Sequence, residues 1–303
     1  MDNLTHSLVG AIIGQTGLKQ RTGLGMAALI IGANLPDIDA VYAVGGTAAS
    51  LQMHRGITHG PLALILMPAV LAALLAGFDR WQDRRGKRPP GRLPVRFGWL
   101  HLLALIGCAT HIAFDWSNSH GVRLLEPFSS RWFYGDLLFI IDIWLWLGFG
   151  IALWRSRHRE RRGSDWRRPA RVAIGVALAY MSVNGVITLA QEEQARAASS
   201  RDRIVIADEV PVAFWRREMI SGTGDGIWMV DDRRYGDVPL ARCDLAKARR
   251  IDPRVGAYLF WSRAPFVRRD KGEWMLADAR YADEPAEIVV PLPPGVCPPV
   301  RPL

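Results

Sequence analysis

Long, uninterrupted apolar runs dominate the first two thirds of the chain. Four of them cover residues 61–78, 98–116, 137–154 and 170–190. Each has about the 17–25 residues that a helix needs to cross a bilayer. Two shorter runs, residues 4–18 and 24–35, flank a polar turn at residues 19–21 and are too short for an ordinary crossing. They predict a helical hairpin that is re-entrant or tilted among the other helices, or else buried in a soluble fold.

The composition changes after this apolar part. Residues 193–203 are polar and charged, and the chain that follows contains short apolar stretches separated by glycine- and aspartate-rich turns. This pattern predicts strands at residues 204–206, 210–215, 226–230, 257–261, 274–276 and 288–291. We therefore expect an α-helical integral membrane bundle over residues 1–192, with about four full spans plus the short N-terminal hairpin. A linker at 193–203 would then lead to a small β-rich extramembrane domain at 204–303.

Basic residues set the expected orientation. The net charge of +9 comes mostly from two arginine-rich loops, at residues 79–96 and 155–171. The positive-inside rule places both loops in the cytoplasm of a bacterial-type inner membrane. Because membrane loops account for the charge, we expect the lipid bilayer as a partner and no nucleic acid. Counting spans puts the β-rich domain outside the cytoplasm, where Cys243 and Cys297 could form a disulfide. The pattern predicts no particular oligomeric state.

Histidine and aspartate side chains fall inside or beside the apolar runs. Taking such groups out of water is costly unless a cation compensates, and both residue types are common ligands of divalent metals. The span count brings them to the outer ends of the helices, with Asp142 about two turns inside the third span, roughly 9 Å by helical rise. We therefore expect one metal site on the outer face. Its candidate ligands are His6, Asp37, Asp39, His54, His59, His111, Asp115, Asp136 and Asp142.

Local spacing gives three of the segments chemistry of their own. His111 and Asp115 are four residues apart and share a helix face, where they can bind one ion or simply each other. Asp37 and Asp39 follow Pro36, where they can bridge metals or form a solvated turn. The segment at residues 54–60 adds two imidazoles, a guanidinium suited to phosphate or carboxylate, and two glycines that allow close approach. Arg55 and Asp39 are the catalytic candidates.

Four segments together resemble a known family. They are Asp2-Asn3-Leu4-Thr5-His6-Ser7, Leu35-Pro36-Asp37-Ile38-Asp39, His54-Arg55-Gly56-Ile57-Thr58-His59 and His111-Ile112-Ala113-Phe114-Asp115. They are similar to the signature segments of the YdjM-like family, described as membrane-bound, metal-dependent hydrolases. The resemblance extends to Glu126-Pro127-Phe128-Ser129 and to short segments near residues 260 and 280. Gly60 stands where a serine or a similar small residue is expected.

Three functions compete. In the first, a divalent metal, best matched by zinc and present as two or more ions, activates water to hydrolyse an ester or phosphoester, a lipid among the candidates. In the second, the polar groups line a metal or proton-coupled membrane transporter, but such a path should reach both membrane faces. In the third, a structural metal clamps a non-catalytic scaffold. Nine candidate ligands exceed one closed coordination sphere, and this surplus favours hydrolysis.

Overall fold

The structure is a computed structural model that describes residues 1–198, 203–282 and 288–298. Within these residues the chain divides into two compact units. The first unit contains residues 1–39, 55–185 and 211–214, and the second contains residues 40–54, 186–210 and 215–303. Each unit is described by itself.

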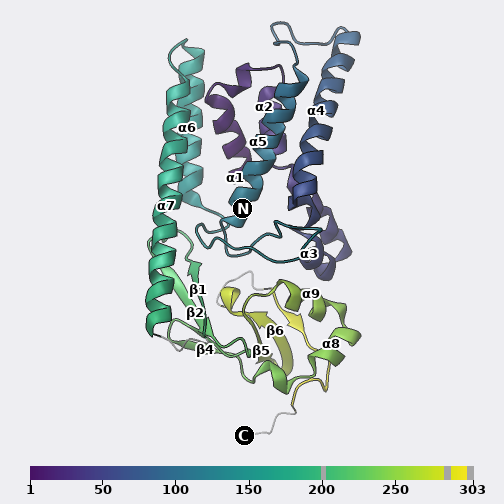
Figure 1. Ribbon diagram of the computed structural model, residues 1–303, viewed down its shortest axis with the longest axis vertical. Helices are drawn as coiled ribbons and strands as arrows, with labels where there is room; N and C mark the ends of the chain where they lie inside the picture. The colour runs from purple at the N-terminus through teal and green to yellow at the C-terminus, as the bar shows by residue number, and fades with distance from the viewer. Residues whose placement is uncertain (199–202, 283–287, 299–303) are drawn as a thin grey trace. The chain divides into compact units, whose positions relative to one another are not determined.

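The first unit is a bundle of helices (Figure 1). Its N-terminal hairpin consists of α1 (Asn3–Gln15) and α2 (Gly25–Gly32), joined through the 3-10 turn η1 (Leu18–Gln20). A second 3-10 segment, η2 (Leu35–Gly45), follows α2, and η3 (Ile57–His59) leads into α4 (Pro61–Arg84). The remaining helices are α5 (Phe97–Trp116), α6 (Ile143–Arg161) and α7 (Arg167–Ala198), of which residues 167–185 belong to this unit. The predicted hairpin is therefore present.

Three helices of the described residues, α4, α5 and α7, are long and apolar enough to cross a membrane. A fourth span is possible if α2 and η2, which meet at a bend of 40°, count as one. The predicted span at residues 137–154 is wrong in its bounds, because α6 begins only at Ile143. Asp142 causes this late start: its side chain accepts hydrogen bonds from the amides of Trp144 and Leu145 and so caps the helix. Asp142 thus lies before α6, not two turns inside it.

Glycines allow α2 and α5 to pack with their backbones nearly in contact. A Cβ atom on Gly107 would lie 2.7 Å from the carbonyl oxygen of Leu29 and 2.7 Å from the amide nitrogen of Ala33. A Cβ atom added to Gly32 would lie 2.7 Å from the carbonyl oxygen of Ala104. Small residues at helix contacts are typical of membrane bundles, where close packing drives association. This close approach brings the C-terminal end of α2 beside the second half of α5.

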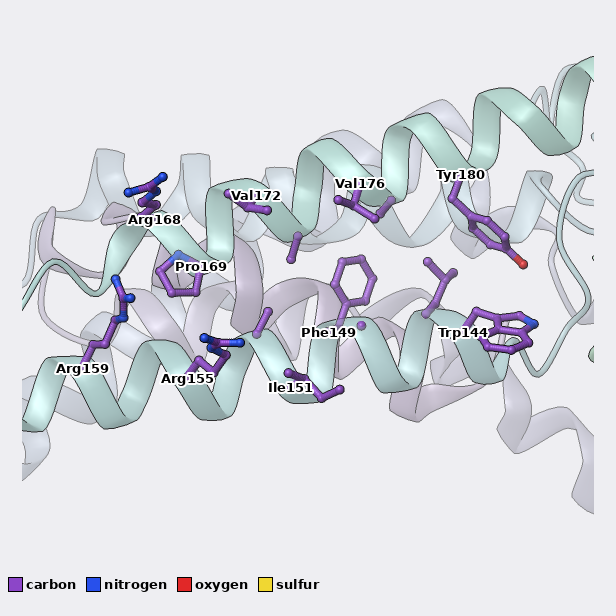
Figure 2. A pocket seen from close by; sticks show the side chains of 15 residues that line it. Trp144, Phe149, Ile151, Arg155, Arg159, Arg168, Pro169, Val172, Val176 and Tyr180 are labelled. Carbon is purple, nitrogen blue, oxygen red and sulfur yellow. The ribbon is translucent and has the colours of Figure 1, made fainter.

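The turn of the N-terminal hairpin and the two arginine-rich loops lie close together at one end of the bundle. Lys19 in η1 forms an ion pair with Glu160 of α6, with its Nζ 2.5 Å from Oε1. The hydroxyl group of Thr22 accepts a hydrogen bond from the amide of Arg96 at 2.8 Å. The predicted hairpin turn therefore lies with the two arginine-rich loops. Between α6 and α7 the same unit contains an apolar groove of about 460 Å³ that ends at several arginines (Figure 2).

The second unit contains two antiparallel sheets and short helices. The first sheet has the order β1-β2-β3-β4 and the second the order β5-β6-β7. Ile206, Ile220, Trp228 and Phe266 form its core. Cys243 and Cys297 form a disulfide, a pairing that the sequence had left open. The elements are α3 (Thr47–Met53), β1 (Ile204–Glu209), β2 (Arg217–Gly222), β3 (Trp228–Val230), β4 (Arg233–Tyr235), η4 (Leu240–Arg242), α8 (Leu245–Ile251), α9 (Pro253–Trp261), β5 (Pro265–Asp270), β6 (Glu273–Asp278), η5 (Ala279–Tyr281) and β7 (Val290–Pro291).

The strand predictions are confirmed in part. The stretches at 204–206, 226–230, 274–276 and 288–291 fall on β1, β3, β6 and β7, but β2, β4 and β5 were not predicted. The prediction at 210–215 is wrong, since these residues are irregular. The prediction at 257–261 is also wrong: Asp252 caps α9 and Pro253 occupies its first turn, and both are helix-start signals. Residues 193–198 of the predicted linker belong to α7, and 199–202 lie outside the described residues.

Candidate metal centre

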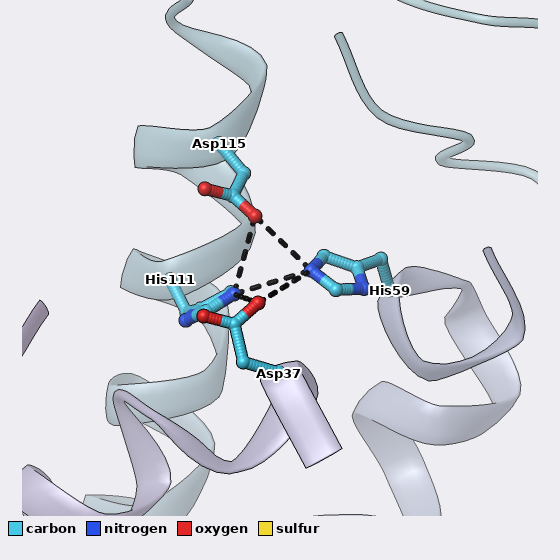
Figure 3. Close-up of side chains that lie close together, drawn as sticks. All are labelled: Asp37, His59, His111 and Asp115. Atoms are coloured by element: carbon cyan, nitrogen blue, oxygen red, sulfur yellow. Dashed lines mark hydrogen bonds and ion pairs between the residues drawn. The ribbon is translucent and has the colours of Figure 1, made fainter. Parts of the chain in front are cut away.

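Four side chains from three segments meet at the other end of the first unit (Figure 3). Asp37 comes from η2, His59 from η3, and His111 with Asp115 from the last turns of α5. One ligand atom of each lies within 4.8 Å of the others. His59, His111 and Asp115 are fully buried, whereas the side chain of Asp37 is 14% exposed. The cluster is therefore accessible from outside the bundle only on the side of Asp37, among its four members.

The distances fit one ion. His59 Nε2 lies 3.1 Å from His111 Nε2 and 3.1 Å from Asp115 Oδ2, and His111 Nε2 lies 3.2 Å from the same oxygen. Asp37 Oδ1 lies 3.3 Å from His111 Nε2 and 3.9 Å from His59 Nε2. Around a zinc ion with bonds of about 2.0–2.1 Å, tetrahedral ligand atoms are roughly 3.3–3.4 Å apart. These four residues therefore have the spacing and the chemistry of a divalent metal site.

In each histidine, a hydrogen bond at Nδ1, which faces away from the cluster, determines that Nε2 points into it. His111 Nδ1 lies 2.7 Å from the carbonyl oxygen of Ala33, which can only accept, so this nitrogen carries the proton. The hydroxyl group of Thr58 donates to Asp39 Oδ2 at 2.6 Å and therefore accepts from His59 Nδ1, 3.0 Å away. Both Nε2 atoms consequently present lone pairs, 3.1 Å apart, and need a proton or cation between them. Metal-ligating histidines are oriented in this way by their outer nitrogen.

The second oxygen of Asp115 faces positive and imidazole groups. Its Oδ1 atom lies 3.2 Å from Nη2 of Arg55 and 3.4 Å from Nε2 of His6, and it also contacts the amino group of Met1. His6 is buried and stacks on His111 with ring centroids 3.8 Å apart. The charge of Arg55 beside Oδ1 disfavours a second cation at that oxygen. The four-residue cluster therefore has the geometry of one ion. Asp37 and Asp39 also belong to a second group of side chains that could hold an ion, so the two or more ions expected from the sequence stay a prediction.

Arg55 and Asp39 connect the cluster to its surroundings. The guanidinium of Arg55 donates through Nη1 to Asn118 Oδ1 at 2.9 Å and to the carbonyl oxygen of Gly121 at 3.3 Å, and its side chain is buried. Asp39 accepts the amide of Arg55 at 2.9 Å and lies behind His59, with Oδ2 3.5 Å from Nδ1. Both residues hold other site residues in place. The catalytic roles assigned to them from the sequence stay predictions.

The loop between α5 and α6 packs over the site. A Cβ atom on Gly60 would lie 1.9 Å from the carbonyl oxygen of Glu126, so the expected serine would not fit at this position. Arg123 in the same loop is buried, and burial lowers its pKa, although Glu126 at 3.6 Å acts in the opposite direction. Its guanidinium lies 5.3 Å from the ring of Trp132. Arg123 therefore stabilises the loop through contacts within the protein.

The other candidate ligands lie outside the four-residue cluster. Asp142 caps α6 and accepts a hydrogen bond from the hydroxyl group of Tyr180 at 2.9 Å. Asp136 is buried in the loop with a left-handed φ of 51°. His54 follows α3 and belongs to the second unit. Sequence reasoning missed Thr58 as an orienting residue, although its hydroxyl group directly precedes a histidine ligand.

Comparison with known proteins agrees with this architecture. The model of the YdjM inner membrane protein family matches residues 1–190. The chain belongs to this family. A relative, the uncharacterized protein YfhP of Bacillus subtilis (strain 168), is 27% identical over 164 residues, which cover 51% of this chain and 46% of that protein. No solved structure matches the chain.

Family membership covers the whole cluster, since its four residues all fall between residues 1 and 190. The resemblance found in the sequence is therefore confirmed for the helical part, together with an inner-membrane location. The match ends before the β-rich domain, so the likeness noted near residues 260 and 280 lies beyond it.

Proposed function

We propose that this protein is a membrane-bound, metal-dependent hydrolase that cleaves an ester or phosphoester. One observation carries the proposal: two buried imidazoles, each held through Nδ1, direct their Nε2 atoms at two carboxylates. A proton alone would satisfy one contact of this group, whereas a divalent cation would satisfy all four. The mixture of imidazole and carboxylate ligands suits zinc.

Each residue then has a defined task. A bound divalent metal would lower the pKa of water to near neutrality and stabilise negative charge on the substrate oxygen. His59, His111 and Asp115 would hold it, and burial of all three keeps bulk water away from its inner side. Asp37, the exposed member, would accept the proton of the attacking water. Arg55 holds Asp115 in place through an ion pair with Oδ1, the carboxylate oxygen that faces away from the cluster.

The surroundings of Asp37 support a lipid or another amphiphilic phosphoester as the substrate. The side chains of Ile38 and Ile57, on the two 3-10 segments that carry Asp37 and His59, are 61% and 53% exposed. Exposed apolar residues beside a polar site suit a substrate with both an apolar and an anionic part. The site also lies at the end of helices that can cross a membrane.

Metal content and hydrolysis, measured on the same detergent-purified samples, test this proposal. We expect about one zinc per chain in the wild type and hydrolysis of a phosphoester or ester panel that a chelator abolishes. His59→Ala and Asp115→Asn should lose both the metal and the activity. His158→Ala is the matched control, because His158 stacks on Trp154 of α6, away from the cluster. A wild-type protein that binds no metal after reconstitution would refute the proposal.

A structural clamp is the second candidate, and one observation favours it. Four of the nine expected ligands form one cluster, and four ligands can close a tetrahedron, as structural zinc sites do. Asp37→Asn separates the two functions. If Asp37 serves the reaction, the variant keeps its metal and loses hydrolysis. If Asp37 closes a clamp, the variant releases the metal and the protein loses thermal stability, with no hydrolysis in the wild type either.

We also propose that the arginine-rich loops face the cytoplasm, so that the metal centre and the β-rich domain face outward. The positive-inside rule supports this orientation. The native cysteines should not react with a thiol label, since Cys108 is buried and the other two form the disulfide. A cysteine at Ser164 should react with an impermeant maleimide only in inside-out vesicles, and one at Thr223 only in right-side-out vesicles. The reverse pattern would refute this orientation.

A further inference from the structure

The groove between α6 and α7 lies outside the metal centre. Its volume is about 460 Å³, and its walls are formed by apolar faces of both helices (Figure 2). Phe149 of α6 points toward α7, while Val172 and Val176 of α7 line the opposite wall. A Cβ atom added to Gly148 would meet no atom within 4 Å, so this wall is open where the glycine stands. The groove can therefore hold an apolar chain.

Three arginines gather at one end of this groove: Arg155 and Arg159 of α6 and Arg168 of α7. Arg159 donates to the backbone carbonyl of Asp165 at 3.4 Å, but among the described residues none of the three has a carboxylate partner. The acidic residues nearby are engaged elsewhere. Glu160 binds Lys19, and the carboxylate of Asp165 accepts the amide of Arg167 at the start of α7. This end of the groove carries uncompensated positive charge.

Aromatic residues close the opposite end. The indole nitrogen of Trp144 donates to the carbonyl oxygen of Val212 at 2.8 Å. The ring of Phe214 packs edge-on against Trp144 and Tyr180, with centroid distances of 6.2 and 5.3 Å. From Trp144 to Arg159 the helix rises about 22 Å, more than the roughly 15 Å of one leaflet of hydrocarbon. The groove thus has a charged entrance, an apolar length of membrane dimensions and a closed end.

We propose that this groove binds an anionic phospholipid, with its phosphate at the three arginines and an acyl chain between α6 and α7. Arginine recognises phosphate through its planar donors, and basic pockets between membrane helices are known binding places for anionic lipid headgroups. A zwitterionic lipid would bring a positive group to the same arginines and bind less well. This site is independent of the hydrolase proposal, since it shares no residue with the metal cluster.

Native mass spectrometry of the detergent-purified full chain tests the proposal, with phosphatidylglycerol and phosphatidylcholine of the same acyl chains as probes. Each basic residue near an anionic headgroup contributes roughly fivefold to binding. We therefore expect the wild type to prefer phosphatidylglycerol by at least about tenfold. The triple variant Arg155→Gln/Arg159→Gln/Arg168→Gln should lose this preference. Gly148→Phe should weaken the binding of phosphatidylglycerol by filling the groove, and the open space at this position lets the variant fold.

The matched control removes the same number of positive charges from α6 and its C-cap without changing a residue that lines the groove. Arg157, Arg161 and Arg162 lie beside the groove arginines in sequence but do not line it. The control variant with all three changed to glutamine should keep the preference for phosphatidylglycerol. Equal loss in the control variant would mean that general charge attraction explains the binding. That result, or unchanged binding in Gly148→Phe, would overturn the proposal.

Discussion

Thr58→Val tests how the metal centre is oriented, because this change removes a hydroxyl group without changing the shape of the side chain. Thr58 donates to Asp39 at 2.6 Å and accepts from His59 Nδ1 at 3.0 Å. In the variant the imidazole loses the acceptor that keeps the proton on Nδ1, so His59 can turn or take the other tautomer. We expect the protein to fold normally and to bind zinc more weakly.

The structure sets the expected size of this effect. Loss of an outer partner of a metal ligand weakens binding by about 10–100-fold. Asp39 keeps its hydrogen bond from the amide of Arg55, and its Oδ2 remains 3.5 Å from His59 Nδ1. The carboxylate can therefore still attract the Nδ1 proton, and the loss should fall near the lower limit. We expect about tenfold weaker zinc binding, which corresponds to about 1.4 kcal/mol.

Competition with a chromophoric chelator gives the dissociation constant for zinc in purified protein. Thr16→Val serves as the control, since Thr16 donates to the carbonyl oxygen of Ile13 at 2.7 Å and lies at the far end of α1. It should bind zinc like the wild type. Equal affinity in Thr58→Val and wild type, or an equal loss in Thr16→Val, would refute the assigned tautomers.

Three further predictions concern packing and the β-rich domain. In Gly107→Val the new Cβ atom would lie 2.7 Å from the backbone of α2, so the free energy of unfolding should fall by about 1–3 kcal/mol. Thermal unfolding measures this loss, and zinc binding should weaken in the same variant. Replacing Cys243 and Cys297 with serine opens a loop with a sequence separation of 54 residues and should lower the stability of this domain by about 4 kcal/mol in denaturant titrations. Burial raises the pKa of Asp278, but the charge and hydrogen bonds of Arg280 outweigh it and lower the pKa overall. The stability that Asp278 contributes should therefore be present above about pH 4 and decline below it, with a smaller decline in Asp278→Asn.

The hydrophobic pattern predicted the helical bundle well where the whole helix is apolar. Helices α4, α5 and α7 lie where the apolar runs predicted them. The same pattern misplaced α6, because it treated Asp142 as a polar residue inside a run. An aspartate directly before an apolar helix is an N-cap signal, and this signal would have moved both the helix start and the candidate ligand.

The site was predictable as a set of residue types and only partly as a set of contacts. His111 and Asp115 share a face at helical spacing, and the ends of the apolar runs indicated Asp37 and His59. The acceptor that orients His111 is the backbone carbonyl of Ala33. No side-chain pattern encodes this contact, because it depends on glycines that let α2 approach α5.

The four-residue cluster changes the argument for catalysis that the sequence alone supported. The surplus of ligands had favoured an open or multinuclear site, but a cluster of four ligands can equally form one closed site. The solvent exposure of the four ligands now distinguishes a catalytic site from a structural one. Three members of the cluster are fully buried, while Asp37 is 14% exposed and flanked by exposed apolar side chains. A purely structural site gains from burying every ligand, since water competes for an exposed one. A partly exposed carboxylate beside a buried ligand triad is what hydrolysis requires, because substrate and water must reach the metal from that side.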